Sequence, residues 1–223
     1  VAVVSITRHG IALAGKVVAA LPGAQLFAPE KFRAEAEAAA PGVAHCYTGK
    51  VGEQIPVLFT RFDALVAIVS LGAVVRLIAP HLKSKEIDPA VVVLDEAGRF
   101  AIPVLSGHLG GANALAGHLG IALGAAPVLT TASDSRQTIG VDLLGHEFGW
   151  VLDATHAELV HCSAAMVNDE PVVLVQECGR TDWWESHANG RSGPLPTNVS
   201  LCQRIEDIDP DSYAAVLWIS RRD

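Results

Sequence analysis

Two short polar stretches in the middle of the chain carry the residue types that ligand chemistry needs. The first is Ser106-Gly107-His108-Leu109-Gly110-Gly111, with Asn113 just beyond it at the start of a helix-like pattern. The second is Thr130-Thr131-Ala132-Ser133-Asp134, which follows the apolar run 127–129. Glycines let backbone N–H groups approach a ligand, and a helix start leaves N–H donors unpaired beside a partial positive charge. The two stretches therefore predict a binding site for a carboxylate or a phosphate.

The expected order of elements places both stretches after strands. Residues 99–105 and 127–129 predict strands, and the helix between them stops at Gly124. Open parallel sheets bind ligands at the carboxyl ends of their strands, so neighbouring strands would bring the polar side chains of both stretches to one crevice. The structural alternative is that the glycines only allow close helix–strand packing, while Ser133 and Asp134 cap the next helix.

His108 is the titratable residue of the first stretch. A histidine changes charge near neutral pH, so it can act as a general base or acid, or ligate a metal carried by a ligand. The alternative is a loop histidine that only makes hydrogen bonds. His146, His156 and His161 lie at spacings that do not favour one helical face, so no resident metal site is expected.

Basic residues follow the strand predicted at 63–70. Gly72 comes just after that strand, and Arg76 lies in the short helix predicted at 74–78. Arg76 is either an anion clamp or a surface salt-bridge partner. Lys83 lies in the charged segment 81–88, which predicts a solvated loop, with contact to substrate carboxylates as the alternative.

Composition excludes several classes of protein. The net charge is −8, from 24 acidic and 16 basic residues, and aromatic residues make up 5%. With no basic stripe and no aromatic stacking platform, no nucleic-acid partner is expected. No apolar run reaches the roughly 18 residues that span a bilayer, so no membrane partner is expected.

Cysteine spacing and the first residues indicate the compartment. The four cysteines lie far apart with no CxxC pair, which predicts neither a disulfide framework nor a zinc site. A reducing cytoplasm is the simplest expectation. No basic region precedes the first apolar run, so no signal peptide is expected, and the absence of an initial Met indicates a processed or trimmed product.

The pattern predicts an α/β protein with an open, mostly parallel sheet and flanking helices over residues 1–134, followed by a smaller α/β domain over 135–223. Segments 90–94 and 99–105 predict a hairpin, which makes the sheet mixed. Pro103 should then lie at a strand end, an edge or a bulge. The remaining expectations are an irregular segment at 45–52, a short helix at 141–150 and a surface loop at 179–198.

Four blocks in order resemble the signature of the CbiG proteins, which are cobalt-precorrin-5A hydrolases of anaerobic cobalamin biosynthesis. The blocks are residues 70–80, 88–95, 105–113 and 130–134. Arg8, Gly10 and residues 29–32 also look like the family's first segment, and the rest of the chain loosely resembles its middle region. Family members usually carry a further C-terminal domain.

The resemblance implies opening of the δ-lactone on ring A of a cobalt tetrapyrrole, with release of acetaldehyde. Such a reaction needs a base to activate water and donors for the oxyanion. His108 or Asp134 would be the base, and the N–H groups of Gly110 and Gly111 the donors. The cobalt arrives inside the substrate, so no cofactor is expected. The residues expected to bind substrate are Gly72, Arg76, Lys83, Ser106, Gly107, Gly110, Gly111, Asn113, Thr130, Thr131 and Ser133.

Two other functions stay open from the sequence. One is a non-catalytic corrinoid-binding module that works with a separate C-terminal domain or with other enzymes of the pathway. The other is a binder of a phosphorylated metabolite on the Gly110/Gly111 loop, by analogy of fold alone. The partners considered are the cobalt tetrapyrrole, that separate domain or those enzymes, and a second copy of the chain in a homodimer.

Overall fold

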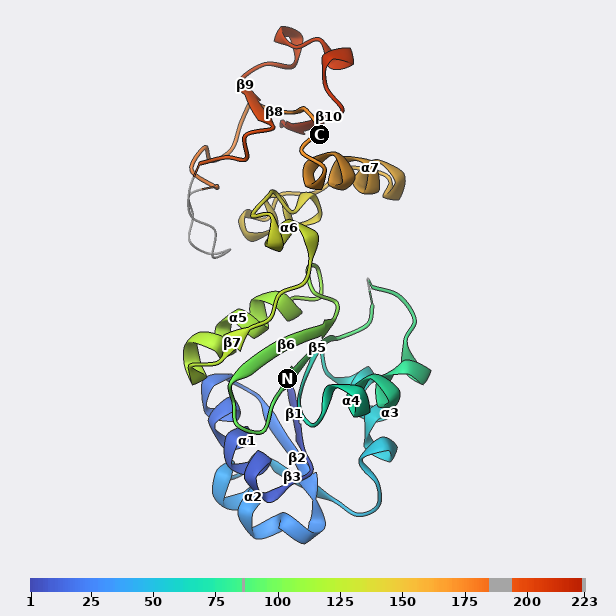
Figure 1. Cartoon of the computed structure of the whole chain (residues 1–223), viewed down its shortest axis with the longest axis vertical. Helices are drawn as coiled ribbons and strands as arrows, with labels where there is room; N and C mark the ends of the chain where they lie inside the picture. Colours follow the sequence, from blue (N-terminus) through green and yellow to red (C-terminus); the bar gives the residue numbers. More distant parts are fainter. Residues whose placement is uncertain (86, 185–193, 222–223) are drawn as a thin grey trace. The chain divides into compact units, whose positions relative to one another are not determined.

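The computed structural model describes residues 1–85, 87–184 and 194–221, and the chain divides into two compact units. Unit 1 is Val1–Leu129 and unit 2 is Thr130–Asp223 (Figure 1). This division falls before the second polar stretch, whereas the sequence placed the domain boundary after Asp134. Residues 185–193, inside the predicted surface loop 179–198, lie outside the described residues.

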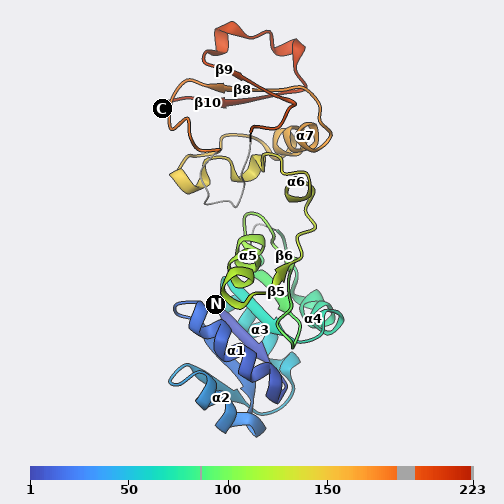
Figure 2. The same ribbon diagram turned by 60° about the vertical axis from the view of Figure 1, so that its left-hand side comes forward.

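Unit 1 is a mixed seven-stranded sheet with helices on both faces (Figures 1 and 2). Its strand order is β3-β2-β1-β4-β5-β6-β7. The strands are β1 Ala2–Ser5, β2 Gln25–Pro29, β3 Ala44–Tyr47, β4 Ala64–Ile68, β5 Ala90–Leu94, β6 Phe100–Leu105 and β7 Ala126–Pro127. One face packs against α1 Arg8–Ala20, α2 Arg33–Ala39 and α5 Ala112–Leu123, and the other against α3 Val51–Arg61 and α4 Leu71–Ile78. The predicted fold class is confirmed.

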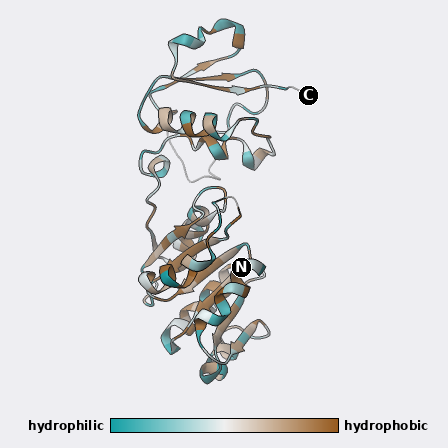
Figure 3. Ribbon diagram, turned by 90° about the vertical axis from the view of Figure 1, so that its right-hand side faces the viewer, coloured by the Kyte–Doolittle hydropathy of each residue, from teal (hydrophilic) through white to brown (hydrophobic). Residues whose placement is uncertain are grey.

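The central strands are apolar on both sides, which is why helices cover both faces of the sheet (Figure 3). Every residue of β4 and of β5 is buried. Because side chains alternate along a strand, Ala64 and Val66 join the core under α1, while Leu65 and Ala67 join the core under α3.

Strands β5 and β6 form the predicted antiparallel hairpin, which makes the sheet mixed. The pairing register shifts between Val91 and Val92, whose partners are Leu105 and Pro103. A bulge therefore borders Pro103, as expected for a residue that cannot donate a ladder hydrogen bond.

The reversal at β6 divides the loops of unit 1 between two edges of the sheet. Strands β1 to β5 all run in one direction, so the loops that follow them leave at one edge. Strands β6 and β7 run the opposite way, so the loops that follow them leave at the other edge, where β5 begins. A loop that follows β4 and a loop that follows β6 therefore cannot line the same crevice.

The segment 45–52 is irregular only at residues 48–50, so the prediction of irregular structure is wrong for its two ends. It contains most of β3 and the start of α3. Strand β3 is at the edge of the sheet, where His45 is exposed and the backbone pairs with β2. Polar residues on an edge strand weaken the apolar pattern from which strands are predicted.

Unit 2 is a small parallel sheet in the order β10-β8-β9, with α7 His156–Val167 packed on it. Strands β8 Val172–Gln176 and β10 Ala215–Ile219 were predicted, while β9 Val199–Cys202 was not. The helix predicted at 141–150 is instead two 3-10 segments, Val141–Leu143 and His146–Phe148. Gly145 and Gly149 have positive φ and so interrupt a continuous helix.

A capping box starts α7 and gives a test of the fold of unit 2. Thr155 accepts the N–H of Glu158 at 3.3 Å, and the Glu158 carboxylate accepts the N–H of Thr155 at 2.7 Å. We expect Thr155→Ala to lower the free energy of unfolding by about 1 kcal/mol, because a helix N–H loses its partner. Urea unfolding followed by tryptophan fluorescence measures this. Thr155→Ser keeps the hydroxyl and is the control; equal losses in both variants would contradict the capping role.

Candidate functional site

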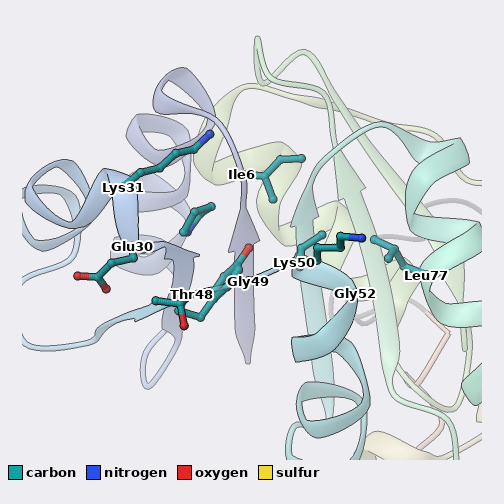
Figure 4. A pocket seen from close by; sticks show the side chains of 11 residues that line it. Ile6, Glu30, Lys31, Thr48, Gly49, Lys50, Gly52 and Leu77 are labelled. Carbon is teal, nitrogen blue, oxygen red and sulfur yellow. The ribbon is translucent and has the colours of Figure 1, made fainter.

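A pocket opens at the edge of unit 1 where β1, β2 and β3 end (Figure 4). Its volume is about 780 Å³. Ile6 follows β1, and Glu30 and Lys31 follow β2. Residues 48–50 join β3 to α3, Val51 and Gly52 begin α3, and Leu77 belongs to α4. Loops of three neighbouring strands and two helices thus build one concave surface.

The order of the strands explains why a pocket forms here. From β1 the chain moves outward to β2 and β3, with α1 and α2 on one face. It then returns through α3 on the other face to β4, which lies on the opposite side of β1. Where connections leave in opposite directions, the loops separate and a crevice forms at the carboxyl ends of the strands; open α/β sheets bind ligands in such crevices.

Helix α3 begins at this pocket without a side-chain cap. Its N-cap, Lys50, has an extended backbone and makes no capping hydrogen bond with its side chain. Gly49 has a φ of 86°, a left-handed conformation that lets the chain turn from β3 into the helix. The N–H of Glu53 donates to the Lys50 carbonyl, whereas the N–H groups of Val51 and Gly52 have no partner among the described residues. These two donors are available to an anion.

The charges that line the pocket favour an anion. Lys50 is exposed and forms no salt bridge with any described residue. The Lys31 ammonium lies 4.8 Å from the centre of the Phe32 ring, a cation–π contact that keeps its charge. The one lining carboxylate, Glu30, accepts hydrogen bonds from Arg33 at 2.7 and 2.6 Å. These bonds lower the pKa of Glu30 and offset its negative charge.

Tyr47 lines the pocket from the end of β3 and is 9% exposed. Its hydroxyl is buried and has no hydrogen-bond partner among the described residues. Burial disfavours the phenolate and raises the pKa of Tyr47 to about 12. A buried hydroxyl without a partner costs free energy.

We expect Tyr47→Phe to change how stability depends on pH. The phenol of the unfolded chain ionises near pH 10, but that of the folded chain near pH 12, so unfolding releases a proton between these values. Wild-type stability should therefore fall across this window by more than that of the variant. Below pH 9 the variant should be at least as stable, because it buries no unpaired hydroxyl. Urea unfolding by circular dichroism at pH 8 and pH 11 measures both; parallel losses would contradict the assignment.

The loop predicted from Ser106 to Asn113 leads from β6 into α5. Several of its backbone N–H groups already donate to carbonyls of the same loop. The N–H of Gly111 donates to the carbonyl of His108 at 2.8 Å. Those of Ala112 and Asn113 donate to Ser106 and Gly107 at 3.1 and 2.9 Å. The role of oxyanion donor proposed for Gly111 is thus not supported, because its N–H closes a turn.

Glycine in this loop is required by close packing. A Cβ on Gly110 would lie 2.3 Å from the Cβ of Ser106, and a Cβ on Gly107 would lie 2.9 Å from the side-chain oxygen of Asn113. Ser106 itself has a φ of 55°, which is uncommon for a residue other than glycine. Packing within the loop thus accounts for Gly110, whereas Gly111 has open space around it and a φ of 83°; His108 is half-buried.

Asp88 fixes the loop to the edge of the sheet where β5 begins. The Ser106 hydroxyl donates to the Asp88 carbonyl at 2.8 Å, and the Asp88 carboxylate accepts the N–H of Lys83 at 3.0 and 3.1 Å. The predicted loop is irregular and exposed at Leu82, Lys83 and Lys85, but Asp88 at its end is only 8% exposed. The structure thus brings Lys83 together with the Ser106–Asn113 loop.

Gly72 and Arg76 lie at the other edge, in α4 after β4. The Arg76 guanidinium donates to the carbonyl of Gly72 at 2.8 Å and so folds back on its own helix. The structure therefore separates these two residues from Lys83 and Ser106, and their contact with substrate stays a prediction. The antiparallel turn into β6 sends the two groups to opposite edges.

The stretch from Thr130 to Asp134 belongs to unit 2. Thr131 is the N-cap of the short helix α6 Ala132–Ser135, and its hydroxyl donates to the Asp134 carboxylate. Ser133 is buried, and its carbonyl accepts the N–H of Thr138 at 2.9 Å. These contacts stabilise a local turn.

Sequence reasoning missed the pocket that β1, β2 and β3 form. The signal was Gly49-Lys50 before a run with helical spacing, but β3 in front of it was not recognised. Only Glu30 and Lys31 had been noted, as part of the family's first segment.

Two structural absences hold for the residues that the structure describes. No three His, Cys, Asp or Glu side chains gather closely enough there to hold a metal ion. None of the described helices combines the length and the apolar character needed to cross a bilayer.

Two family models match the chain: Cobalamin synthesis G N-terminal over residues 53–134, and Cobalamin biosynthesis central region over residues 139–223. The cobalt-precorrin-5A hydrolase of Priestia megaterium is 40% identical over 222 residues, which are 100% of this chain and 57% of that protein. The enzyme of the same name from Salmonella typhimurium is 34% identical over 213 residues, 94% of this chain and 56% of that protein.

The crystal structure of a Sulfolobus solfataricus protein, assigned as a cobalamin biosynthesis protein G homolog, matches with a TM-score of 0.49 and 20% identity, over 97% of this chain and 58% of that one. The chain spans a little over half the length of the curated relatives it matches.

Proposed function

The chain belongs to the CbiG family of cobalamin biosynthesis, and on that premise we propose that it contributes to the hydrolysis of cobalt-precorrin 5A. The observation that carries this proposal is the 40% identity to a cobalt-precorrin-5A hydrolase along the whole chain. The family resemblance of the four sequence blocks is confirmed by the two family models.

The proposed reaction is lactone hydrolysis. The oxygen of a water molecule bonds to the lactone carbonyl carbon, the ring C–O bond breaks, and the products are a carboxylate and a hydroxyl. The new hydroxyl then loses its proton and becomes the carbonyl of acetaldehyde, while the carbon–carbon bond that joins this fragment to the macrocycle breaks and its electron pair passes to the macrocycle. Cobalt enters as part of the substrate. We also propose that the enzyme is cytoplasmic and has no cofactor of its own.

A base must take the proton of the attacking water, and donors must stabilise the oxyanion. His108 and Asp134 are the bases proposed from sequence. His108 lies in unit 1 and Asp134 in unit 2, and each is within hydrogen-bonding or electrostatic contact of other groups. His108→Gln and Asp134→Asn test them separately.

The test is a single-turnover assay without oxygen. The chain is mixed with cobalt-precorrin 5A, and both acetaldehyde and the absorbance of the tetrapyrrole are followed. Acetaldehyde release supports hydrolysis by residues 1–223, and a spectral shift alone indicates that residues beyond this chain complete the site. The absence of both signals would contradict the proposal. In the variants, an unchanged rate of release removes the substituted residue as the base.

A further inference from the structure

We infer that the pocket at the ends of β1, β2 and β3 holds the carboxylate arms of the tetrapyrrole, against Lys31, Lys50 and the start of α3. The ligand class rests on the proposed function; the location rests on the structure. The pocket takes one edge of the macrocycle, since its volume of about 780 Å³ is typical of sites for a compact ligand.

The lining suits a ligand that is apolar in its ring and charged at its arms. Ile6 and Leu77 present apolar side chains, and in the view of Figure 4 Ile6 lies between the two lysines. Apolar contact removes ring surface from water, while the lysines stay at the opening. A lysine is a point charge on a flexible stem, so it can follow an arm whose direction varies.

Local charge must attract this ligand, because the chain as a whole carries −8. Lys31, Lys50 and the positive end of the α3 dipole supply that charge. Of the nearby carboxylates, Glu30 is held by Arg33 and points away from Lys50 in Figure 4. The Glu53 carboxylate belongs to the first turn of α3 and lies over Gly49, so it offsets part of the charge of the helix start.

Two kinds of donor remain for carboxylate oxygens here. They are the lysine ammonium groups and the backbone N–H groups of Val51 and Gly52. The Tyr47 hydroxyl is enclosed by protein and presents no exposed surface to a ligand. A site built for a neutral ligand would not need such an excess of donors.

The Ser106–Asn113 loop offers a ligand carboxylate fewer unpaired backbone donors than the pocket does. Three of its N–H groups are used within the loop, and it lies at the edge of the sheet opposite the pocket. A ring held in the pocket lies at the other edge of the sheet from the His108 loop, and His108→Gln tests whether that residue acts as the base.

The experiment measures binding of cobyrinic acid, a stable cobalt corrinoid whose peripheral arms are free carboxylates, by titration of the corrinoid absorbance. We expect Lys31→Gln and Lys50→Gln each to weaken binding about tenfold, and the double variant to weaken it further. Lys16→Gln removes an exposed charge from α1 and should bind like wild type. The corrinoid whose arms are all amides should bind weakly. Its affinity for wild type should not exceed the affinity of cobyrinic acid for the double variant.

Different results overturn the inference and the proposed function. Wild-type affinity in the double variant, a loss confined to Lys83→Gln, or no binding by wild type would each reject this pocket. Lysine-dependent binding of the acid with no conversion of cobalt-precorrin 5A and no spectral shift would keep the pocket and reject the function. Tyr47→Phe removes a hydroxyl that the protein encloses, so this variant should bind like wild type.

Discussion

Leu174→Ala is expected to lower the free energy of unfolding of unit 2 by about 2–5 kcal/mol, a typical cost for a buried leucine that leaves a cavity. Leu174 lies in β8, the middle strand of the small sheet, and is 0% exposed. Both neighbouring strands and α7 pack around it, so the cavity has little freedom to close.

Tryptophan fluorescence during urea unfolding measures this loss selectively. All four tryptophans lie in unit 2, at positions 150, 183, 184 and 218. Leu201→Ala is a matched control, because Leu201 is the partner of Leu174 across the β8–β9 pair but is 63% exposed. Equal losses in both variants would contradict the assignment of Leu174 to the core.

Gly110→Ala is expected to destabilise unit 1 by about 1–3 kcal/mol, the usual cost of overpacking. The new methyl group would lie 2.3 Å from the Cβ of Ser106 and 2.8 Å from its carbonyl oxygen. That oxygen accepts the N–H of Ala112, so relief of the clash must move the turn that starts α5. Calorimetry and far-ultraviolet circular dichroism follow this unit, which contains no tryptophan.

Gly117→Ala should have the opposite sign. Gly117 lies inside α5, where an added Cβ meets no atom within 4 Å. Replacing a helical glycine by alanine stabilises by about 0.5–1 kcal/mol when space allows. If both alanine variants stabilise unit 1, the loop does not pack as described. If Gly110→Ala also leaves corrinoid binding unchanged, the loop is structural rather than part of the binding surface.

Elements with a strong apolar pattern could be predicted from the sequence. Strands β4 and β5 were recognised because each is a continuous apolar run, and the hairpin into β6 because a short Gly-containing turn follows β5. Strands β3 and β9 were missed. Both lie at sheet edges with exposed side chains, and backbone pairing with a neighbour gives them their structure.

The site could be predicted only in part. The residue types of a loop can be read from the local sequence, but the direction of each strand in the sheet depends on distant segments. The loop glycines and His108 were correctly located between a strand and a helix, and Asn113 at the start of that helix. The sequence did not show that the loop carbonyls would accept the N–H groups of Gly111 and Ala112. It also did not show that Arg76 would fold back on Gly72. Such bonds depend on dihedral angles that composition does not specify.

The sequence by itself determined the fold class, the hairpin and the family, since apolar periodicity and ordered motifs are properties of the chain. The tertiary structure alone decided which loops share an edge. The reversal at β6 separates Lys83 and Ser106 from Arg76, and the return of the chain to β4 opens a pocket beside Lys50. Both follow from the direction and order of strands, which hydrogen bonds between distant segments establish.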